Sequence, residues 1–330
     1  MAVNLRRTAR DERILLHYNG HGCPRPTSNG EIWVFNKNFT QYIPVSLHEL
    51  HSWAGSRTIY VVDCPATGEV LNAFAQIRQV EAQNDESVEH QREAKGDIIL
   101  VACRANQILP QTPQLPADIF TSCLTTPIKM AVVWYQVVNK QRRFRDVPTN
   151  IADLLDGQPN DRKTPTGELN WIFTAITDTI AWIELPKDLF QRLFRQDLLL
   201  ASLFRNFLLA DRIMSQLNCN PQSYPEFPST AKHHMWEVWD LALDRCVSQV
   251  LKIQSGEQKE YKPSTFFMEQ LGAFELWLTF AGPNSPPPQQ LPIILQVLLS
   301  PSHRLRALLL LARFLDMGDR FIDMALSVGI

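Results

Sequence analysis

The amino-acid sequence predicts an α/β domain followed by an all-helical region. Over residues 1–145, short runs of β-branched and aliphatic residues alternate with helical patterns, which is typical of an α/β domain with a buried sheet. After residue 146 the strand signals vanish and long helical patterns take over, ending in a unit that resembles a helical repeat. The change in pattern predicts a domain boundary between the two parts.

Three runs in the first part have strand length, apolar centres and polar or glycine-containing borders. They cover residues 13–18, 58–63 and 97–103. Apolar residues at helical spacing fill the intervals at residues 47–53 and 68–80. The order strand, helix, strand, helix, strand predicts parallel strands joined by right-handed crossovers.

Other segments of the first part give weaker patterns. Residues 31–35 follow Asn29 and Gly30, which predicts a short hairpin or an excursion strand outside the sheet. Residues 79–96 carry almost no apolar mass and are predicted to form an exposed loop. Residues 130–138, entered after a Thr-Pro pair, predict a helix that closes the first domain.

The second part is predicted to be helical throughout. Residues 166–185 place apolar side chains at steps of three and four, so one stripe faces a core. Residues 185–217 are apolar on nearly all faces in their middle, which predicts that neighbours surround them. Further helices are predicted at 233–253, at 264–280, and as three helices within 291–330 that are separated by Pro301 and Gly318.

The turn and helix at residues 301–311 resemble part of a HEAT or armadillo repeat. One such unit cannot bury its apolar face alone and needs stacked neighbours. The pattern therefore predicts a helical region that is incomplete at its C-terminal end. The predicted organisation is an α/β domain at 1–145, a linker at 146–165 and the helical region at 166–330.

Composition excludes several classes of function. The 330-residue chain has 32 basic and 34 acidic side chains, so it lacks the positive surplus of nucleic-acid-binding proteins. Neither phosphate-binding glycine motif occurs, so no nucleotide cofactor is predicted. No secretion signal and no apolar run of about 20 residues are present, which predicts a cytoplasmic protein without membrane insertion. Six scattered cysteines form no CxxC pair, and His233 and His234 lack acidic or thiol partners, so no metal site is predicted.

One constellation has the arrangement of a catalytic site. His21 and Gly22 follow the first predicted strand, and Cys64 follows the second. Caspase-like proteases use this layout because strand ends bring an imidazole and a thiol together. A cysteine peptidase with Cys64 as nucleophile and His21 as proton carrier is therefore one hypothesis. Pro65 directly after the thiol fits neither register of the caspase motif, so we favour a vestigial dyad and a non-enzymatic protein.

Four aromatic residues cluster around the predicted hairpin: Trp33, Phe35, Phe39 and Tyr42. Aromatic side chains on rigid loops are favoured anchors for binding partners, but they also pack hairpins onto sheets. Both interpretations stay open. The basic cluster at residues 140–145 is predicted to be a solvated helix end rather than a nucleic-acid patch.

Long blocks of the sequence resemble the Raptor family. They are residues 17–44, 115–129, 164–182, 185–210 and 291–315. The resemblance implies a caspase-like α/β domain followed by an armadillo/HEAT-type helical solenoid. It also implies that the first strands of the caspase-like sheet are missing, because such a sheet ordinarily has strands before the one that bears the histidine. Family members commonly carry Asp-Cys-Ser, whereas Pro65 stands in place of the serine here.

The resemblance also implies a function. Raptor proteins are regarded as non-catalytic scaffolds of the rapamycin-sensitive TOR complex. They bind the TOR kinase, present substrates that carry a TOR-signalling motif, and receive nutrient signals through Rag GTPases at the lysosome or vacuole surface. The resemblance therefore implies a cytoplasmic adaptor in a dimeric complex that regulates cell growth.

Overall fold

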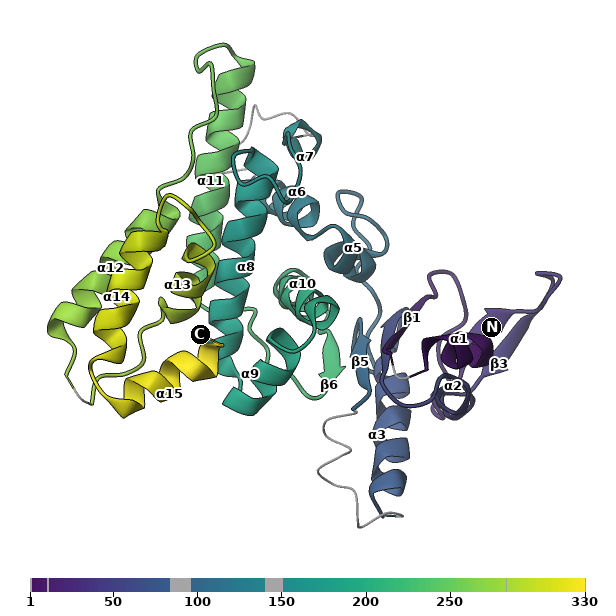
Figure 1. Ribbon diagram of the computed structural model, residues 1–330. Helices are drawn as coiled ribbons and strands as arrows, with labels where there is room; N and C mark the ends of the chain where they lie inside the picture. Colours follow the sequence, from purple (N-terminus) through teal and green to yellow (C-terminus); the bar gives the residue numbers. More distant parts are fainter. Residues whose placement is uncertain (1, 11, 84–95, 140–150, 283, 330) are drawn as a thin grey trace. The chain divides into compact units, whose positions relative to one another are not determined.

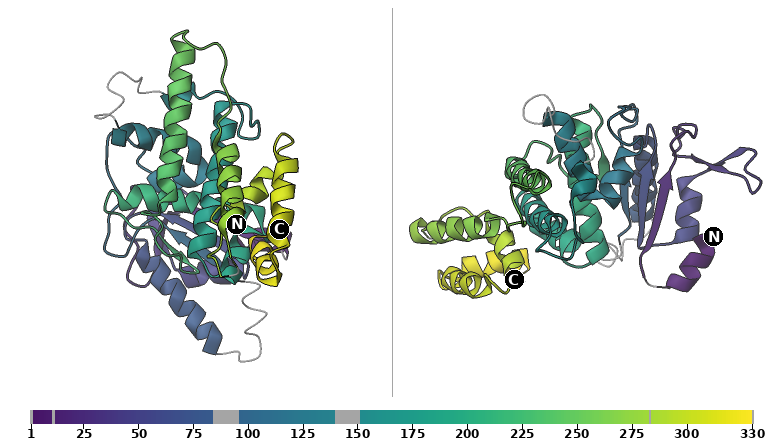
Figure 2. Two further views of the ribbon diagram at one scale, coloured as in Figure 1. Left: turned by 90° about the vertical axis from the view of Figure 1, so that its left-hand side faces the viewer. Right: turned by 90° about the horizontal axis from the view of Figure 1, so that it is seen from above.

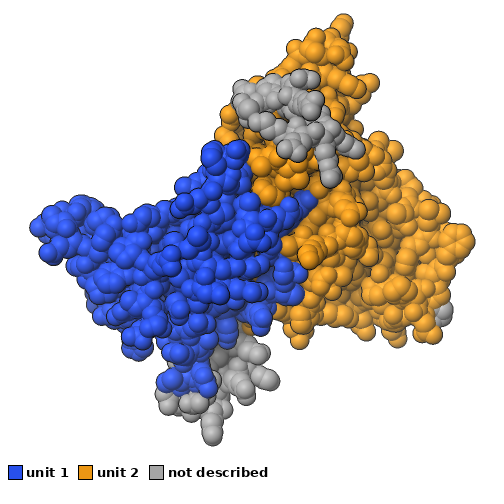
Figure 3. Space-filling model, turned by 180° about the vertical axis from the view of Figure 1, so that it is seen from behind, with its two compact units in different colours: residues 1–125, 210–229 blue, residues 126–209, 230–330 orange. Residues whose placement is uncertain are grey.

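The computed structural model describes residues 2–10, 12–83, 96–139, 151–282 and 284–329. The chain divides into two compact units, which Figure 3 distinguishes by colour: one comprises residues 1–125 and 210–229, the other residues 126–209 and 230–330. Each unit is therefore assembled from two separate segments of the sequence. The domain limits expected from the sequence, at 145 and 166, remain a prediction.

A four-stranded sheet forms the centre of the first unit, with the order β1-β4-β5-β6 (Figure 1). The strands are β1 (Ile14–Asn19), β4 (Thr58–Asp63), β5 (Ile98–Val101) and β6 (Gln222–Tyr224). The first three pair in parallel, as the sequence predicted, and β6 adds to β5 in the antiparallel direction. All residues of β4 and β5 are buried, which explains why these two strands read as continuous apolar runs.

The expectation that no strand follows residue 146 was wrong, because β6 completes the sheet. Its sequence, Gln-Ser-Tyr, is short and polar and gives no strand pattern by itself. Pairing supplies the stability: Tyr224 lies opposite Ile99, and Gln222 lies opposite Val101. The Ser223 hydroxyl also donates to the Pro225 carbonyl at 2.8 Å.

The helices α2 (Leu47–Ala54) and α3 (Gly68–Gln83) form where the sequence predicted them, although α3 continues into the expected loop at 79–96. The remainder of that loop, residues 84–95, lies outside the described residues. Ser46 caps α2 in a reciprocal capping box with Glu49. Both helices pack on one face of the sheet, in a core that contains Leu47, Val70, Phe74, Tyr60, Val62, Ile99 and Val101.

The N-terminal helix α1 (Ala2–Ala9) was not predicted, because it has no apolar stripe and buries none of its residues. One arginine fixes it instead. The Arg6 guanidinium donates to the carbonyls of Arg10 and Glu12, at 2.9 Å each, and to the carbonyl of Ser56 at 2.8 Å. Its Nε also donates to the Ala54 carbonyl at the end of α2. The helix is therefore held by polar contacts of a single side chain.

The predicted hairpin is confirmed as β2 (Ile32–Phe35) paired with β3 (Tyr42–Val45). Its turn lies at residues 36–41, where the Asn36 side chain accepts from the Thr40 amide at 2.9 Å. Gly30 has another role, because a Cβ there would lie only 2.3 Å from the Ala73 Cβ, and its φ is +75°. Only glycine lets this turn lie so close to α3.

The second unit is helical. The helices expected from the sequence form as α6 (Pro127–Asn139), α8 (Pro165–Glu184), α9 (Lys187–Phe194), the first part of α10 (Leu198–Ser215), α11 (Met235–Gln254), α12 (Phe266–Phe280), α13 (Leu291–Val297), α14 (Arg304–Leu315) and α15 (Asp319–Val328). The short helix α7 (Ile151–Leu154) was not expected, because it lies in the predicted linker, and α6 groups with this unit although the sequence predicted that it closes the first domain. The apolar stretch 185–217 forms two helices, α9 and α10, and α10 is buried along most of its length. The basic cluster at 140–145 lies outside the described residues.

Helix α8 is the core of the second unit and contacts α6, α9, α11 and α13. Thr164 caps it, with Pro165 in the first turn. Phe173 packs edge-on against Trp239 of α11, with ring centroids 5.4 Å apart. Asp178 is fully buried in the same helix and lies between two arginines of its unit. Helix α8 is therefore buried on more sides than the single apolar stripe that the sequence predicted.

No helix in the described part of the chain is long and apolar enough to cross a membrane.

Candidate functional site

The carboxyl edge of the sheet holds a cluster of polar side chains. Asp63 ends β4, and its side chain is fully buried. The turn after β1 lies directly beside it, because the Gly20 amide donates to the Asp63 carbonyl at 2.8 Å. This turn carries His21, so the two parallel strands bring an imidazole and a carboxylate to the same edge of the sheet.

The Asp63 carboxylate accepts three hydrogen bonds. His21 Nε2 lies 3.1 Å from Asp63 Oδ1, while the Thr121 amide and hydroxyl donate to Oδ2 at 2.9 and 2.6 Å. Thr121 belongs to α5 (Ile119–Thr125), a helix that the sequence pattern did not indicate. The carboxylate therefore joins three segments: the end of β4, the turn after β1, and α5.

His17 extends this cluster from β1. Its Nε2 lies 3.1 Å from the Thr121 hydroxyl oxygen. Because that hydroxyl donates its proton to Asp63, the oxygen accepts from the imidazole N–H, which fixes the tautomer of a neutral His17. Burial lowers the pKa of His17, although the charges of Asp63 and Asp118 oppose this shift.

His21 is shifted in the opposite direction. Its hydrogen bond to Asp63 raises the pKa of the imidazole above the ordinary value of 6.5, partial burial opposes the shift, and the charges of Asp63 and Asp118 add to it. The protonated form is thus stabilised in the folded chain. The two histidines of the cluster respond differently because only His21 contacts the carboxylate directly.

We expect a pH-dependent contribution of His21 to stability. Because the pKa is raised on folding, the contribution is fully present below the unfolded value of about 6.5 and is lost as pH rises through the folded pKa. Urea unfolding of wild type and His21→Gln between about pH 5.5 and 8.5 measures this contribution. The difference in the free energy of unfolding between the two proteins should shrink as pH rises. The exposed His48, replaced by Gln, is the matched control. A wild-type-minus-His21→Gln difference that stays constant with pH would contradict the pairing.

Cys64 does not join this cluster. Its side chain is 1% exposed and packs with Tyr60 and Val62 on the face of the sheet that α2 and α3 cover. Successive residues of a strand point to opposite faces, so Asp63 and Cys64 separate. Burial is the largest cause that raises the pKa of the Cys64 thiol far above its usual range. The structure therefore brings His21 to Asp63 and not to Cys64.

Two loops cover the segment that follows β4. The Ala66 amide donates to the Gln107 carbonyl at 3.0 Å, and the Cys103 thiol contacts the Cys64 carbonyl at 3.6 Å. The Gln107 side chain is held in turn by Asn220, at 2.9 Å. These contacts fix the backbone that follows Cys64, whose thiol is itself buried.

The histidines and the carboxylate of the cluster can hold and exchange a proton. The one hydroxyl of the cluster, on Thr121, already donates its proton to Asp63. Sequence reasoning missed both Asp63 and Thr121 as members. Asp63 could have been identified because it is an acidic residue at the end of an apolar strand. No pattern in the sequence indicated Thr121. In the described part of the chain, no three His, Cys, Asp or Glu side chains gather as metal ligands would.

The aromatic candidates lie on the β2–β3 hairpin, which projects from its unit (Figures 1 and 2). Phe35 and Tyr42 are cross-strand neighbours with ring centroids 4.6 Å apart, and Phe39 lies in the turn, 77% exposed. Trp33 differs, because its indole N–H donates to the Arg25 carbonyl at 2.9 Å. The structure thus groups three of the four rings into an exposed aromatic cluster and ties the fourth to the preceding loop.

Fold and site together define the class: a caspase-like α/β domain, with a histidine–aspartate pair at the edge where a peptidase needs a histidine and a thiol, joined to a helical region. Residues 1–74 match the family model described as Raptor N-terminal CASPase like domain.

Relatives extend the match to nearly the whole chain. It is 56% identical to Regulatory-associated protein of TOR 2 of rice, over 98% of this chain and 23% of that protein. It is 54% identical to Target of rapamycin complex 1 subunit mip1 of Schizosaccharomyces pombe, over 100% of this chain and 26% of that protein. The crystal structure of Chaetomium thermophilum Raptor covers all of this chain with a TM-score of 0.90 and 52% identity, over 29% of its own length.

The chain belongs to the Raptor family. It spans about a quarter of the length of the curated relatives that it matches. The fold expected from the resemblance, a caspase-like domain followed by an armadillo/HEAT-type helical region, is confirmed.

Proposed function

We propose that this chain contributes to a non-catalytic scaffold of TOR complex 1, which holds substrates near the TOR kinase. The observation that carries the proposal is the similarity, over the whole chain, to relatives named as regulatory proteins or subunits of TOR complex 1. The pairing of His21 with Asp63, rather than with a thiol, supports a role without bond-making by this chain.

In this role the α/β unit and the helical unit present a substrate segment that carries a TOR-signalling motif. Binding the segment raises its effective concentration near the kinase, which is sufficient to promote phosphorylation by another protein. We further propose Rag GTPases as partners of the full-length protein, a dimeric complex, and a cytoplasmic location with recruitment to the lysosome or vacuole surface. Coupling of nutrient signals to cell growth would follow from these contacts.

Affinity capture of TOR kinase from a cell extract tests the proposal. The chain is immobilised, and a version extended at both ends is compared with it. Retention by both supports a sufficient kinase interface within these residues, and retention by the extended version alone means that further segments are needed. If neither retains the kinase, the scaffold proposal fails.

The alternative is a cysteine peptidase that uses Cys64 and His21. We expect an electrophilic peptide probe to leave Cys64 unlabelled in the folded chain, because the thiol is buried and its pKa is raised. Mass spectrometry of the labelled peptides identifies any modified cysteine, and Cys64→Ala is the control. Rapid labelling that this variant abolishes would favour the peptidase.

The exposed aromatic cluster of Phe35, Phe39 and Tyr42 is our candidate contact for partners. Replacing Phe35 and Phe39 together by Ala should weaken capture of the kinase or its substrates by roughly tenfold or more, as expected for aromatic anchors. Because the Phe39 side chain is 77% exposed, unfolding free energy should change little. Ile108→Ala, at a 61% exposed position outside the hairpin, is the matched control. Equal capture by the double variant and this control would exclude the cluster as an anchor.

A further inference from the structure

Two buried thiols meet at one end of the sheet in the first unit. Cys103 follows β5, and Cys219 lies in the segment that leads from α10 to β6. Their side chains are 0% and 1% exposed, and the two thiols form a hydrogen bond with each other. Both cysteines are in the reduced form. We call them the Cys103–Cys219 pair.

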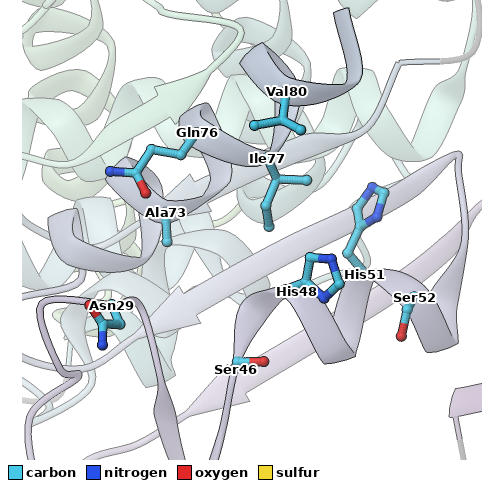
Figure 4. Close-up of a pocket in the computed structure, with 9 residues that line it drawn as sticks. All are labelled: Asn29, Ser46, His48, His51, Ser52, Ala73, Gln76, Ile77 and Val80. Carbon is cyan, nitrogen blue, oxygen red and sulfur yellow. The ribbon is translucent and has the colours of Figure 1, made fainter. Parts of the chain in front are cut away.

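The pair is separate from the other hollow of this unit. A cavity of about 490 Å³ lies between α2 and α3, and Figure 4 shows nine residues that line it. No cysteine is among these nine. A chemical change at the Cys103–Cys219 pair therefore leaves the walls of this cavity unmodified.

Pairing of β5 with β6 brings the two thiols together (Figure 1). Val101 lies opposite Gln222 in the antiparallel register, and the two cysteines lie two and three residues beyond these positions, at the same end of the strands. Opposite Cα atoms of antiparallel strands are about 4.5–5.5 Å apart, and a disulfide joins residues whose Cα atoms are about 4.4–6.8 Å apart. The register therefore brings the two cysteines together where a disulfide can join them.

Contacts with the backbone hold both sulfur atoms at this place. Cys219 Sγ lies 3.6 Å from the carbonyl oxygen of Ala102, the residue directly before Cys103. Cys103 Sγ lies 3.4 Å from the Thr67 hydroxyl oxygen, which also accepts from the Cys103 amide at 2.9 Å. Cys219 and Thr67 thus contact the two ends of the peptide group between Ala102 and Cys103. The Cys219 sulfur is held beside the residue that carries the other thiol.

The surroundings distinguish Cys103 from other buried thiols of the unit. Its hydrogen bond with Cys219 lowers the pKa of Cys103 to about 6, burial opposes the shift, and hydrogen bonds with Thr67 add to it. Burial instead raises the pKa of Cys64 and of Cys123 far above the usual range. Because the thiolate is the nucleophilic form of cysteine, Cys103 is the partner that reacts first.

We propose that Cys103 and Cys219 form a reversible disulfide with hydrogen peroxide as oxidant, and that this bond locks β6 onto β5. The Cys103 thiolate attacks one peroxide oxygen and the O–O bond breaks, which gives a sulfenic acid and hydroxide. The Cys219 sulfur then attacks the sulfenic sulfur, and the S–O bond breaks. The two thiol protons convert the released oxygens to two molecules of water, so two thiols are oxidised and one peroxide is reduced.

The bond restrains a short element of the sheet. Strand β6 has three residues and lies at the sheet edge, and Cys219 comes 116 positions after Cys103 in the sequence. A cross-link across so long a stretch restricts the unfolded chain and thereby stabilises the folded one. Local opening of a short edge strand also gives a small oxidant access to sulfur atoms that are buried in the closed sheet. Oxidation thus fastens together the two sequence segments that build this unit.

Peptide mapping after oxidation tests the proposal. The 330-residue chain is treated with millimolar hydrogen peroxide, its remaining thiols are blocked with N-ethylmaleimide in urea, and it is digested with trypsin without reduction. Residues 96–104 and 213–232 are tryptic peptides that contain one cysteine each, Cys103 and Cys219. We expect mass spectrometry to find these two peptides joined, with the loss of two hydrogen atoms, and dithiothreitol to separate them.

Variants identify the partners. Cys219→Ser should abolish the joined peptides. Cys64→Ala, at a position that is also 1% exposed, is the matched control and should retain them, because Cys103 contacts the Cys64 carbonyl. A link from residues 96–104 to residues 58–78, the tryptic peptide of Cys64, overturns the proposal. So does the absence of any link under conditions that oxidise the half-buried Cys23.

Amide hydrogen exchange tests whether the bond restrains β6. Exchange in peptides that contain β6 should slow by roughly tenfold or more after oxidation, and dithiothreitol should restore the original rate. Peptides from α12, in the second unit, are the control and should keep their rates. Unchanged exchange of β6 in the cross-linked chain would refute the locking of this strand.

Discussion

Replacing Asp178 with Ala should lower the free energy of unfolding by about 3–5 kcal/mol, the usual effect of removing one partner from a buried charge network. The carboxylate is fully buried in α8, and Arg195 Nη1 and Arg205 Nε donate to it at 3.0 and 2.7 Å. Both guanidinium side chains are only 17% exposed. Without Asp178, the guanidinium groups of Arg195, at the end of α9, and Arg205, in α10, would remain largely desolvated and without this shared carboxylate.

Urea unfolding followed by tryptophan fluorescence measures this change. Asp153→Ala is the control, because Asp153 forms an exposed ion pair with Lys129 at 2.6 Å, in which both side chains are more than half exposed. Such a pair contributes at most about 1 kcal/mol. If Asp178→Ala were no more destabilising than Asp153→Ala, the network would not be a main support of the helical unit.

Replacing Asp63 with Ala should lower the free energy of unfolding by roughly 3 kcal/mol or more. The substitution removes the carboxylate. The Thr121 amide then lacks its acceptor, and His21 lacks its hydrogen-bond partner. Asp63→Asn should recover part of the loss, because its carbonyl oxygen still accepts one of these hydrogen bonds.

A second readout separates this effect from simple loss of packing. In Asp63→Ala the pH-dependent part of stability assigned to His21 should disappear, since the raised pKa of His21 derives first from its hydrogen bond to Asp63. Asp118→Ala is the control, because Asp118 interacts with His21 only through its charge. Persistence of the full pH dependence without Asp63 would show that another group controls His21.

Much of the fold could be predicted because buried helices and strands place apolar residues at regular spacings in the sequence. Strands β4 and β5 are buried on both faces and read as apolar runs, while α8 and α11 carry apolar stripes. The elements that were missed lack such a period. Helix α1 is held by the hydrogen bonds of Arg6, and β6 is held by pairing with β5.

The candidate site shows a different limit. His21 was identified from its place after a strand, but the sequence could not tell whether Asp63 or Cys64 faces it. That choice depends on which face of the sheet α2 and α3 cover, because adjacent residues of a strand point to opposite sides. Likewise, the sequence marked Trp33 and Phe39 as similar aromatics, and only the structure separates the ring tied to the Arg25 carbonyl from the exposed one.

The position of β6 in the sequence has a consequence during synthesis. About 120 residues lie between the end of β5 at Val101 and the start of β6 at Gln222. At a typical elongation rate of 5–20 residues per second, a ribosome needs roughly 6–24 s to add them. Throughout that interval the outer edge of β5 has no partner from β6, and an unpaired strand edge is prone to pair with other chains. The nascent α/β unit therefore has an unpaired edge at β5, which chaperones would have to shield until β6 has been synthesised and pairs with it.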